Sequence, residues 1–257
     1  MPSKTLLLEL SALFLLSCGG GDGASPARSA RAQAQAAAAT RTESETGIAF
    51  PPRSHPYGRS MVDWSESWWQ FIYAIPAAQN PELDSTGADC AIGQQGDVWV
   101  LASVIDPGGV ASFSRACTLP AGKALLVSPS GVLNDYPCPD PTFQPAPGQS
   151  LYDFLLAGAK PIVDSVNGLS IVLDGTALAN PFAYRFTSPD LFNVKGDLSL
   201  QSGFDGCITG SPQPAVSDGY FAMLKPLGEG RHTLVIQASD THGTNVTLTW
   251  TLNVVGR

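Results

Sequence analysis

Residues Ser60–Ile75 read SMVDWSESWWQFIYAI, and this stretch decides how the rest of the chain is interpreted. It holds three of the five tryptophans and has the clearest helical pattern in the sequence. Its apolar residues recur at spacings of three and four, which places them on one stripe of an α-helix. The members of that stripe are Met61, Trp64, Trp68, Ile72 and Ile75. The pattern predicts an amphipathic helix with a buried apolar face.

Both ends of this helix carry their own signals. Ser60 precedes the pattern and Asp63 follows three residues later, a pairing that caps the first turn and suits the positive end of the helix dipole. Pro76 stops the pattern because its ring clashes with the preceding turn. Trp69 and Phe71 lie off the main stripe, so we expect the helix to have apolar neighbours on two sides.

The tryptophans allow two interpretations. Burying one aromatic side chain contributes about 1.5–3 kcal/mol, so a helix packed across a sheet is the favoured use of these rings. In the alternative, an exposed indole lines a groove and stacks on a sugar or another flat ligand. Trp64, Trp68 and Trp69 are therefore candidate ligand contacts.

The rest of the 257-residue chain is typical of a mainly β protein, because 26 Gly and 21 Pro are spread among short apolar runs. Near the C-terminus apolar and polar residues alternate strictly, as in a strand with one wet face. The apolar positions there are Val246, Leu248, Trp250, Leu252 and Val254. We expect an antiparallel β-sandwich, immunoglobulin-like or jelly-roll-like, with the tryptophan-rich helix and a second short helix.

Several local features refine this expectation. Residues 97–117 read as a hairpin, in which VWVLASV and VASFSRAC flank the turn sequence DPGG. Ser150 caps the second helix, LYDFLLAGA, and Pro161 is expected to end or kink it. Asp174-Gly175 predicts a second hairpin turn between LSIVL and FAYRF, and HTLVIQAS is the expected partner of the alternating strand.

The N-terminus resembles the signal of bacterial lipoproteins. Residues 1–17 combine Lys4 with an apolar segment too short to span a bilayer as a stable anchor. Leu15-Leu16-Ser17-Cys18 resembles a lipobox, which implies cleavage before Cys18 and acylation of that cysteine. Gly19 at the next position implies the outer membrane. The alternative is an ordinary secretory signal with an incidental cysteine.

These features divide the chain into three parts. Residues 1–17 are the expected signal peptide, and 18–47 the lipidated cysteine with a disordered tether, since this segment lacks aromatic and large aliphatic residues. As flexible coil the tether reaches about 30 Å. Residues 48–257 are the expected single β-rich domain.

Four cysteines remain in that domain, an even number that favours two disulfides in an exported chain. Four cysteines allow three connectivities. We predict Cys90–Cys117, which brackets the first hairpin, and Cys138–Cys207, which ties the Pro-rich loop to a later loop. A metal site built from the four thiolates lacks any C-x-x-C spacing, so no metal and no cofactor are expected.

Five segments between residues 63 and 239 together resemble a family of uncharacterised secreted bacterial proteins. They are DWSESWWQF, GADCAIGQQGDVWVLAS, SRACTLPAGKALLVSPS, FAYRFTSP and SDGYFAMLKPLGEGRHTLVIQAS. The last part of the chain also resembles the end of bacterial immunoglobulin-like domains. That resemblance implies a β-sandwich, and the family carries no activity that can be transferred to this chain.

No catalytic constellation is legible in the sequence. His55, His232 and His242 form neither H-x-x-x-H nor H-E-x-x-H, and the chain has no G-x-S-x-G, no S-x-x-K and no phosphate-binding glycine loop. Aspartates in sequences such as NDYP, PDP, DG and SDG are expected to bond to backbone in turns. They are Asp135, Asp140, Asp174, Asp205, Asp218 and Asp240.

Arg185 lies among aromatic residues on an expected strand, and it is either an inter-sheet anchor with a partner or a ligand contact. The formal charge of −8 argues against nucleic acid as a partner. We therefore expect a lipid-anchored envelope protein, facing the periplasm or the cell surface, with a non-catalytic binding or structural role toward a glycan or protein. The alternative is a hydrolase of envelope glycans or esters with a site assembled from distant loops.

Overall fold

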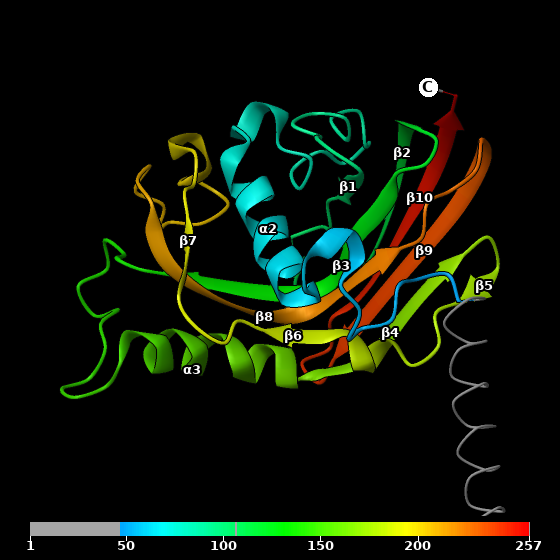
Figure 1. The fold of residues 1–257 in the computed structure, drawn as a ribbon. Coiled ribbons are helices and arrows are strands. Elements are labelled where there is room, and N and C mark those ends of the chain that lie inside the picture. Colours follow the sequence, from blue (N-terminus) through cyan, green and yellow to red (C-terminus); the bar gives the residue numbers. More distant parts are fainter. Residues whose placement is uncertain (1–46, 106, 257) are drawn as a thin grey trace, which may run out of the picture. The chain divides into compact units, whose positions relative to one another are not determined.

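The computed structural model describes residues 47–105 and 107–256, which belong to one compact unit, Ser44–Arg257. The expected signal peptide, Cys18 and almost all of the tether lie outside the described residues. The mainly β prediction is confirmed: two five-stranded sheets, which we name sheet A and sheet B, face each other, and two α-helices accompany them (Figure 1).

Sheet A has the order β1-β3-β8-β6. β7 also pairs with β8, at residues 213–215, whereas β6 pairs with residues 218–220 of the same strand. Its strands are β1 (Val98–Leu101), β3 (Ala124–Asp135), β6 (Arg185–Thr187), β7 (Phe192–Val194) and β8 (Gln213–Leu224). Sheet B has the order β2-β10-β9-β4-β5. Its strands are β2 (Val110–Pro120), β4 (Val166–Leu173), β5 (Thr176–Ala177), β9 (Gly230–Asp240) and β10 (Asn245–Val255).

The predicted hairpin over residues 97–117 is wrong. β1 pairs with β3 and β2 pairs with β10, both in parallel, so the expected two strands lie in different sheets and the sheets are mixed rather than purely antiparallel. Burial explains the separation. β1 is almost entirely buried, whereas β2 alternates between buried and exposed positions as a strand with one wet face does.

The later hairpins are partly as expected. β9 and β10 pair as predicted, and the alternating residues of β10 face the core. Asp174 and Gly175 turn the chain between β4 and β5, but FAYRF does not follow as the return strand. It forms a 3-10 helix and then β6 in sheet A. The 3-10 helices are η1 (Pro56–Gly58), η2 (Ala77–Gln79), η3 (Pro181–Tyr184) and η4 (Leu198–Leu200).

Helix α2 (Met61–Ala74) begins at Ser60, whose side chain accepts from the backbone of Asp63 while Asp63 caps Ser60 in return, as predicted. It lies on one face of sheet A (Figure 1). Trp69, which lies off the main stripe, is buried and donates its indole N–H to Ser217 Oγ over 2.8 Å. The helix therefore has apolar neighbours on two sides, as expected.

Helix α3 (Leu151–Asp164) lies on the opposite face of sheet A (Figure 1). It begins after Ser150 as predicted but does not end at Pro161, which lies inside it. The carbonyls of Pro161 and Ile162 still accept the N–H of Ser165, so the last turn closes in spite of the proline.

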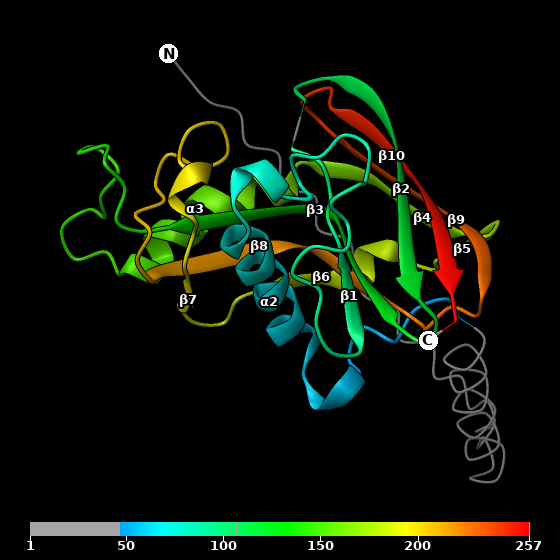
Figure 2. The ribbon, with the colours of Figure 1, turned by 90° about the horizontal axis from the view of Figure 1, so that it is seen from above.

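Sheet A separates two apolar cores. One lies between the two sheets around Trp250, and the other lies between sheet A and α2 around Trp68. Figure 2 shows β3 and β8 running out beyond sheet B toward the side where α3 lies. The two predicted disulfides, Cys90–Cys117 and Cys138–Cys207, are confirmed. Among the described residues, neither helix has the length and apolar character that crossing a bilayer requires.

Candidate functional site: an acidic cleft along the edge of β3

A cleft of about 540 Å³ follows one edge of β3, and every residue from Ser128 to Asp135 lines it. Ligand sites in proteins fall in this size range. β1 covers the edge of β3 only as far as Val127, while β8 pairs with the other side of β3 as far as Asp135. The remaining walls come from α2 with the Phe204 loop, from β9 and β10, and from the segments that carry Glu82, Ser103–Ile105, Phe143, Ile162 of α3 and Val166 of β4.

The charged residues of the cleft are all acidic. Glu82, Asp135, Asp205 and Asp240 line it, and among the described residues that line it there is no lysine, arginine or histidine. Opposite charges favour binding, so the cleft is suited to positively charged or hydrogen-bond-donating ligands.

Asp135 is the most unusual of these acids. Its residue is 3 % exposed, and its Oδ2 has no hydrogen-bond partner among the described residues. Burial, and then the negative charge of Asp205, raise its pKa to about 7. A buried polar atom without a partner is costly, and perturbed carboxyls of this kind are concentrated at functional sites.

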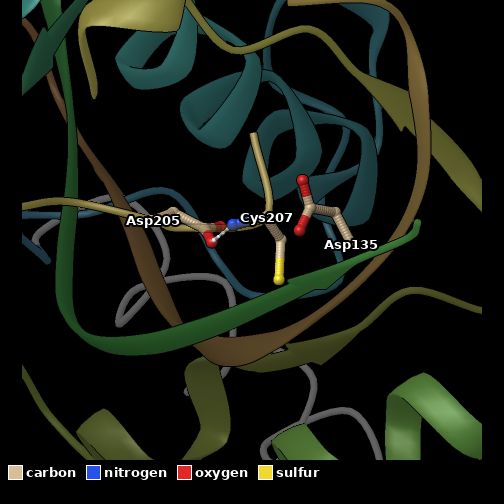
Figure 3. A group of neighbouring side chains, drawn as sticks. All are labelled: Asp135, Asp205 and Cys207. Carbon is tan, nitrogen blue, oxygen red and sulfur yellow. Dashed lines mark hydrogen bonds between the residues drawn. The ribbon is translucent and has the colours of Figure 1, made fainter. Parts of the chain in front are cut away.

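Asp205 lies beside Asp135, with carboxylate oxygens within 4.8 Å (Figure 3). Its Oδ2 accepts the hydroxyl of Tyr73 over 2.7 Å and its Oδ1 accepts the backbone N–H of Cys207 over 2.8 Å. These two donors hold the Asp205 carboxylate in place. Cys207 Sγ lies in the same group but is bonded to Cys138, so it offers no thiolate and a metal ion would find only the two carboxylates there.

Glu82 is the second unpartnered acid of the cleft. Its residue is 7 % exposed, its Oε1 accepts the hydroxyl of Ser103 over 2.6 Å, and its Oε2 has no partner among the described residues. Burial raises its pKa to about 7, against the opposing effects of Ser103 and Arg115. Arg115 donates to the backbone carbonyls of Ser103 and Glu82 and so fixes this corner of the cleft.

Tyr73 interacts with the acidic groups of the cleft. Burial raises the pKa of its hydroxyl well above the ordinary value, and the charges of Asp205, Asp135 and Glu82 add to the shift. All three acids are therefore close enough to act electrostatically on the Tyr73 hydroxyl, and Asp205 accepts its hydrogen bond.

The three candidate tryptophans do not gather in one open groove. Trp68 and Trp69 line the cleft but are 1 % and 9 % exposed. Trp64 is half-buried, its indole N–H donates to Pro56 O, and Arg59 stacks on its ring at 4.4 Å. Stacking on a flat ligand stays a prediction for these rings, and Trp68 and Trp69 have little open surface for it.

Arg185 has partners but does not join the two sheets. Its guanidinium binds both carboxylate oxygens of Asp218, at 3.0 and 2.5 Å, and reaches Asp164 at the end of α3 over 2.7 Å. It therefore ties β6 to β8 within sheet A and to α3. The expectation of an inter-sheet anchor is wrong because η3 carries the arginine back into sheet A.

The predicted turn role of the aspartates holds for some of them. Asp140, Asp205 and Asp240 each accept backbone N–H groups a few residues onward. Asp135 and Asp218 instead lie within β3 and β8 and are buried. The short sequences NDYP and SDG around these two aspartates resemble turn sequences, so the prediction placed them in turns rather than in strands.

The histidines lie outside the cleft. His232 Nδ1 contacts Asp174 at 2.6 Å, and its Nε2 contacts Gly228 O at 3.0 Å. Because both ring nitrogens are engaged, this pair has no free nitrogen to act as a general base.

Sequence reasoning missed Glu82 and Tyr73 as site residues and assigned Asp135 and Asp205 to turns. One signal in the sequence could have identified Asp135 as buried. It lies two residues after Leu133 in the strand ALLVSPSGVLND, so both side chains are on the same, buried face. A comparison with models of known protein families finds no match for the chain, and a comparison with curated proteins finds none either.

Proposed function

We propose that the chain is a lipid-anchored, extracytoplasmic binding protein whose cleft takes a ligand with positively charged, hydrogen-bond-donating groups. The observation that carries the proposal is the pair of buried, unpartnered carboxyl oxygens, Asp135 Oδ2 and Glu82 Oε2, in one cleft without cationic side chains. A ligand ammonium group supplies the donors that these oxygens lack.

The extracytoplasmic location is supported by two disulfides, which persist in oxidising compartments. The lipobox-like sequence ending at Cys18 supports the anchor. Cys18→Ala is expected to release the protein from the membrane fraction. Retention of the variant in membranes contradicts the lipoprotein assignment, and so does a purified parent protein that keeps residues 1–17 and carries no fatty acid.

The linear triamine spermidine is the first probe of the cleft. Calorimetry at low salt with the full-length protein is expected to show binding, with release of protons near pH 7 because an ammonium group favours the ionised forms of Asp135 and Glu82. Asp135→Asn and Glu82→Gln should each weaken binding. Asp97→Asn is the control, since Asp97 is exposed and does not line the cleft. Equal binding by all four proteins contradicts the proposal.

A hydrolase of envelope glycans is the second candidate, favoured by the Asp135–Asp205 pair. One carboxyl with a pKa near 7 beside a hydrogen-bonded carboxylate is the arrangement of a general acid and a nucleophile. In that reaction Asp135 gives its proton to the leaving oxygen, Asp205 forms a bond to the sugar carbon, and water then cleaves that bond. The spacing is closer to that of retaining than of inverting enzymes.

The two candidates differ in what Asp205 does. Incubation with cell-wall glycan separates them: a hydrolase releases reducing ends, and Asp205→Ala abolishes the release. A binding protein releases none at any pH between 5 and 8.

A further inference from the structure

We propose that the ligand of the cleft is an extended basic peptide segment, which binds as an added strand along Ser130–Asp135 of β3. This inference rests on the proposed function and specifies its ligand. Three observations support it: the free edge of the strand, the different chemistry of its two sides, and the walls around it.

The edge is free where the cleft runs. In residues 47–105 and 107–256 no strand pairs with β3 beyond Val127 on the side away from β8. The register slips between Val127 and Ser130, where Pro129 lacks the N–H that a ladder needs. From Ser130 to Asp135 the strand is regular again and spans about 20 Å at 3.3 Å per residue. An extended peptide that pairs with this edge gains main-chain hydrogen bonds.

The two sides of the edge differ. Leu133 belongs to the core under α2, and Asp135 follows it on the same face, near Asp205 and Tyr73. Asn134 points to the other face, where its side chain donates to Leu155 O of α3. On that side the cleft is lined largely by apolar residues, among them Val132, Ile162, Val166, Ile236 and Ala238. Side chains of a strand alternate between faces, so the fitting peptide alternates basic and apolar residues.

The walls favour a single segment over a second copy of this chain. Native proteins protect an exposed edge with lysine or by covering it, but Ser130–Asp135 contains no lysine. The edge is instead recessed between the α2 wall and the β9–β10 wall. A single peptide enters such a cleft, whereas the edge of another whole sheet collides with both walls.

The test uses full-length protein in mild detergent and the acetylated, amidated peptide Lys-Val-Lys-Val-Lys. The alternating peptide is expected to bind at least about tenfold more tightly than a Lys-Lys-Val-Val-Lys peptide and than a copy N-methylated at every residue, because the first loses the alternation and the second loses the pairing. Asp135→Asn is expected to weaken binding about tenfold, and Asp205→Asn provides a second variant if the first folds poorly. Asp97→Asn should bind as the parent does.

The outcomes separate this inference from the proposed function. If spermidine binds and the N-methylated peptide binds as well as its parent, strand addition is wrong and the proposal of a cation-binding cleft stands. If neither spermidine nor any peptide binds, both proposals fail. Binding that Asp135→Asn and Asp205→Asn leave unchanged places the peptide elsewhere, and dimers in light scattering that the peptide does not dissociate identify a second copy as the occupant.

Discussion

Sheet A buries two aspartates on neighbouring strands, and their surroundings are opposite. Asp218 on β8 is fully buried, and its two oxygens receive Arg185 and the hydroxyl of Thr187. Asp135 on β3 is nearly as buried, yet one of its oxygens has no partner among the described residues and its nearest charged neighbour is another carboxylate, Asp205.

The difference separates a structural acid from a candidate binding acid. A buried carboxylate paired with arginine holds elements together, and losing the partner is expensive. Asp218 in turn raises the pKa of Arg185 further above its ordinary value, through their hydrogen bonds. A buried carboxyl oxygen without a partner lowers the stability of the fold. Proteins typically keep such a destabilising group only where it serves a function.

The largest expected effect comes from breaking the Arg185–Asp218 pair. Arg185→Ala leaves the Asp218 carboxylate buried without a cation and should lower the free energy of unfolding by about 3–5 kcal/mol in urea titrations. Asp164→Asn removes only the exposed partner of the same arginine, which solvent screens, and should cost far less. Equal costs for the two variants contradict the structural role of the Arg185–Asp218 pair.

The second effect comes from opening the Cys138–Cys207 disulfide beside Asp205. Cys138→Ser with Cys207→Ser opens a link between residues 69 apart and should lower the free energy of unfolding by about 4 kcal/mol. Because Asp205 accepts the N–H of Cys207, spermidine binding should weaken too. Mass mapping without reductant should find no alkylated thiol in the native domain, and labelling of Cys138 or Cys207 contradicts the bridge.

The third effect is a pH dependence that comes from the unpaired acids. Asp135 and Glu82 keep their protons up to about pH 7 in the native state, whereas unfolded chains lose them near pH 4. Unfolding therefore releases protons between these values, and stability falls as the pH rises from 4 to 7. Asp135→Asn with Glu82→Gln should flatten the curve, and Asp97→Asn should retain it.

The smallest effect concerns one hydroxyl. Tyr73→Phe removes the hydrogen bond to Asp205 and should cost about 1 kcal/mol. Tyr184→Phe is the matched control, since its hydroxyl donates to a neutral carbonyl, Phe50 O. Only Tyr73→Phe should also shift the titration of Asp135, whose pKa is raised by burial and by the charge of Asp205, as carboxylate NMR shifts would report. The same shift in both variants contradicts the link between Tyr73 and the acidic pair.

Local signals predicted the local structure. The Ser60–Asp63 cap, the stripe that buries Trp68 and the alternation of β10 each depend on residues a few positions apart, so they were legible in the sequence. The cysteine pairings followed from their number and from the loops they bracket.

The pairing of strands that are far apart in the chain could not be predicted from the sequence. Residues 97–117 carry good turn chemistry, but the partner of β1 is β3 and the partner of β2 is β10, and only the assembled sheets decide that choice. The cleft was missed for the same reason. Glu82, Asp135 and Asp205 are far apart in the chain, and no short spacing predicts that they line one cleft with Tyr73.

The place of β10 has a consequence for the order of assembly. It lies between β2 and β9, and its ladder with β2 joins residues more than a hundred positions apart. A ribosome-bound chain that stops short of Asn245 leaves β2 without a neighbour among the described strands, so sheet B has a gap. Contacts of this sequence separation form late and slowly. Sheet B is therefore completed only when nearly all of the polypeptide is available.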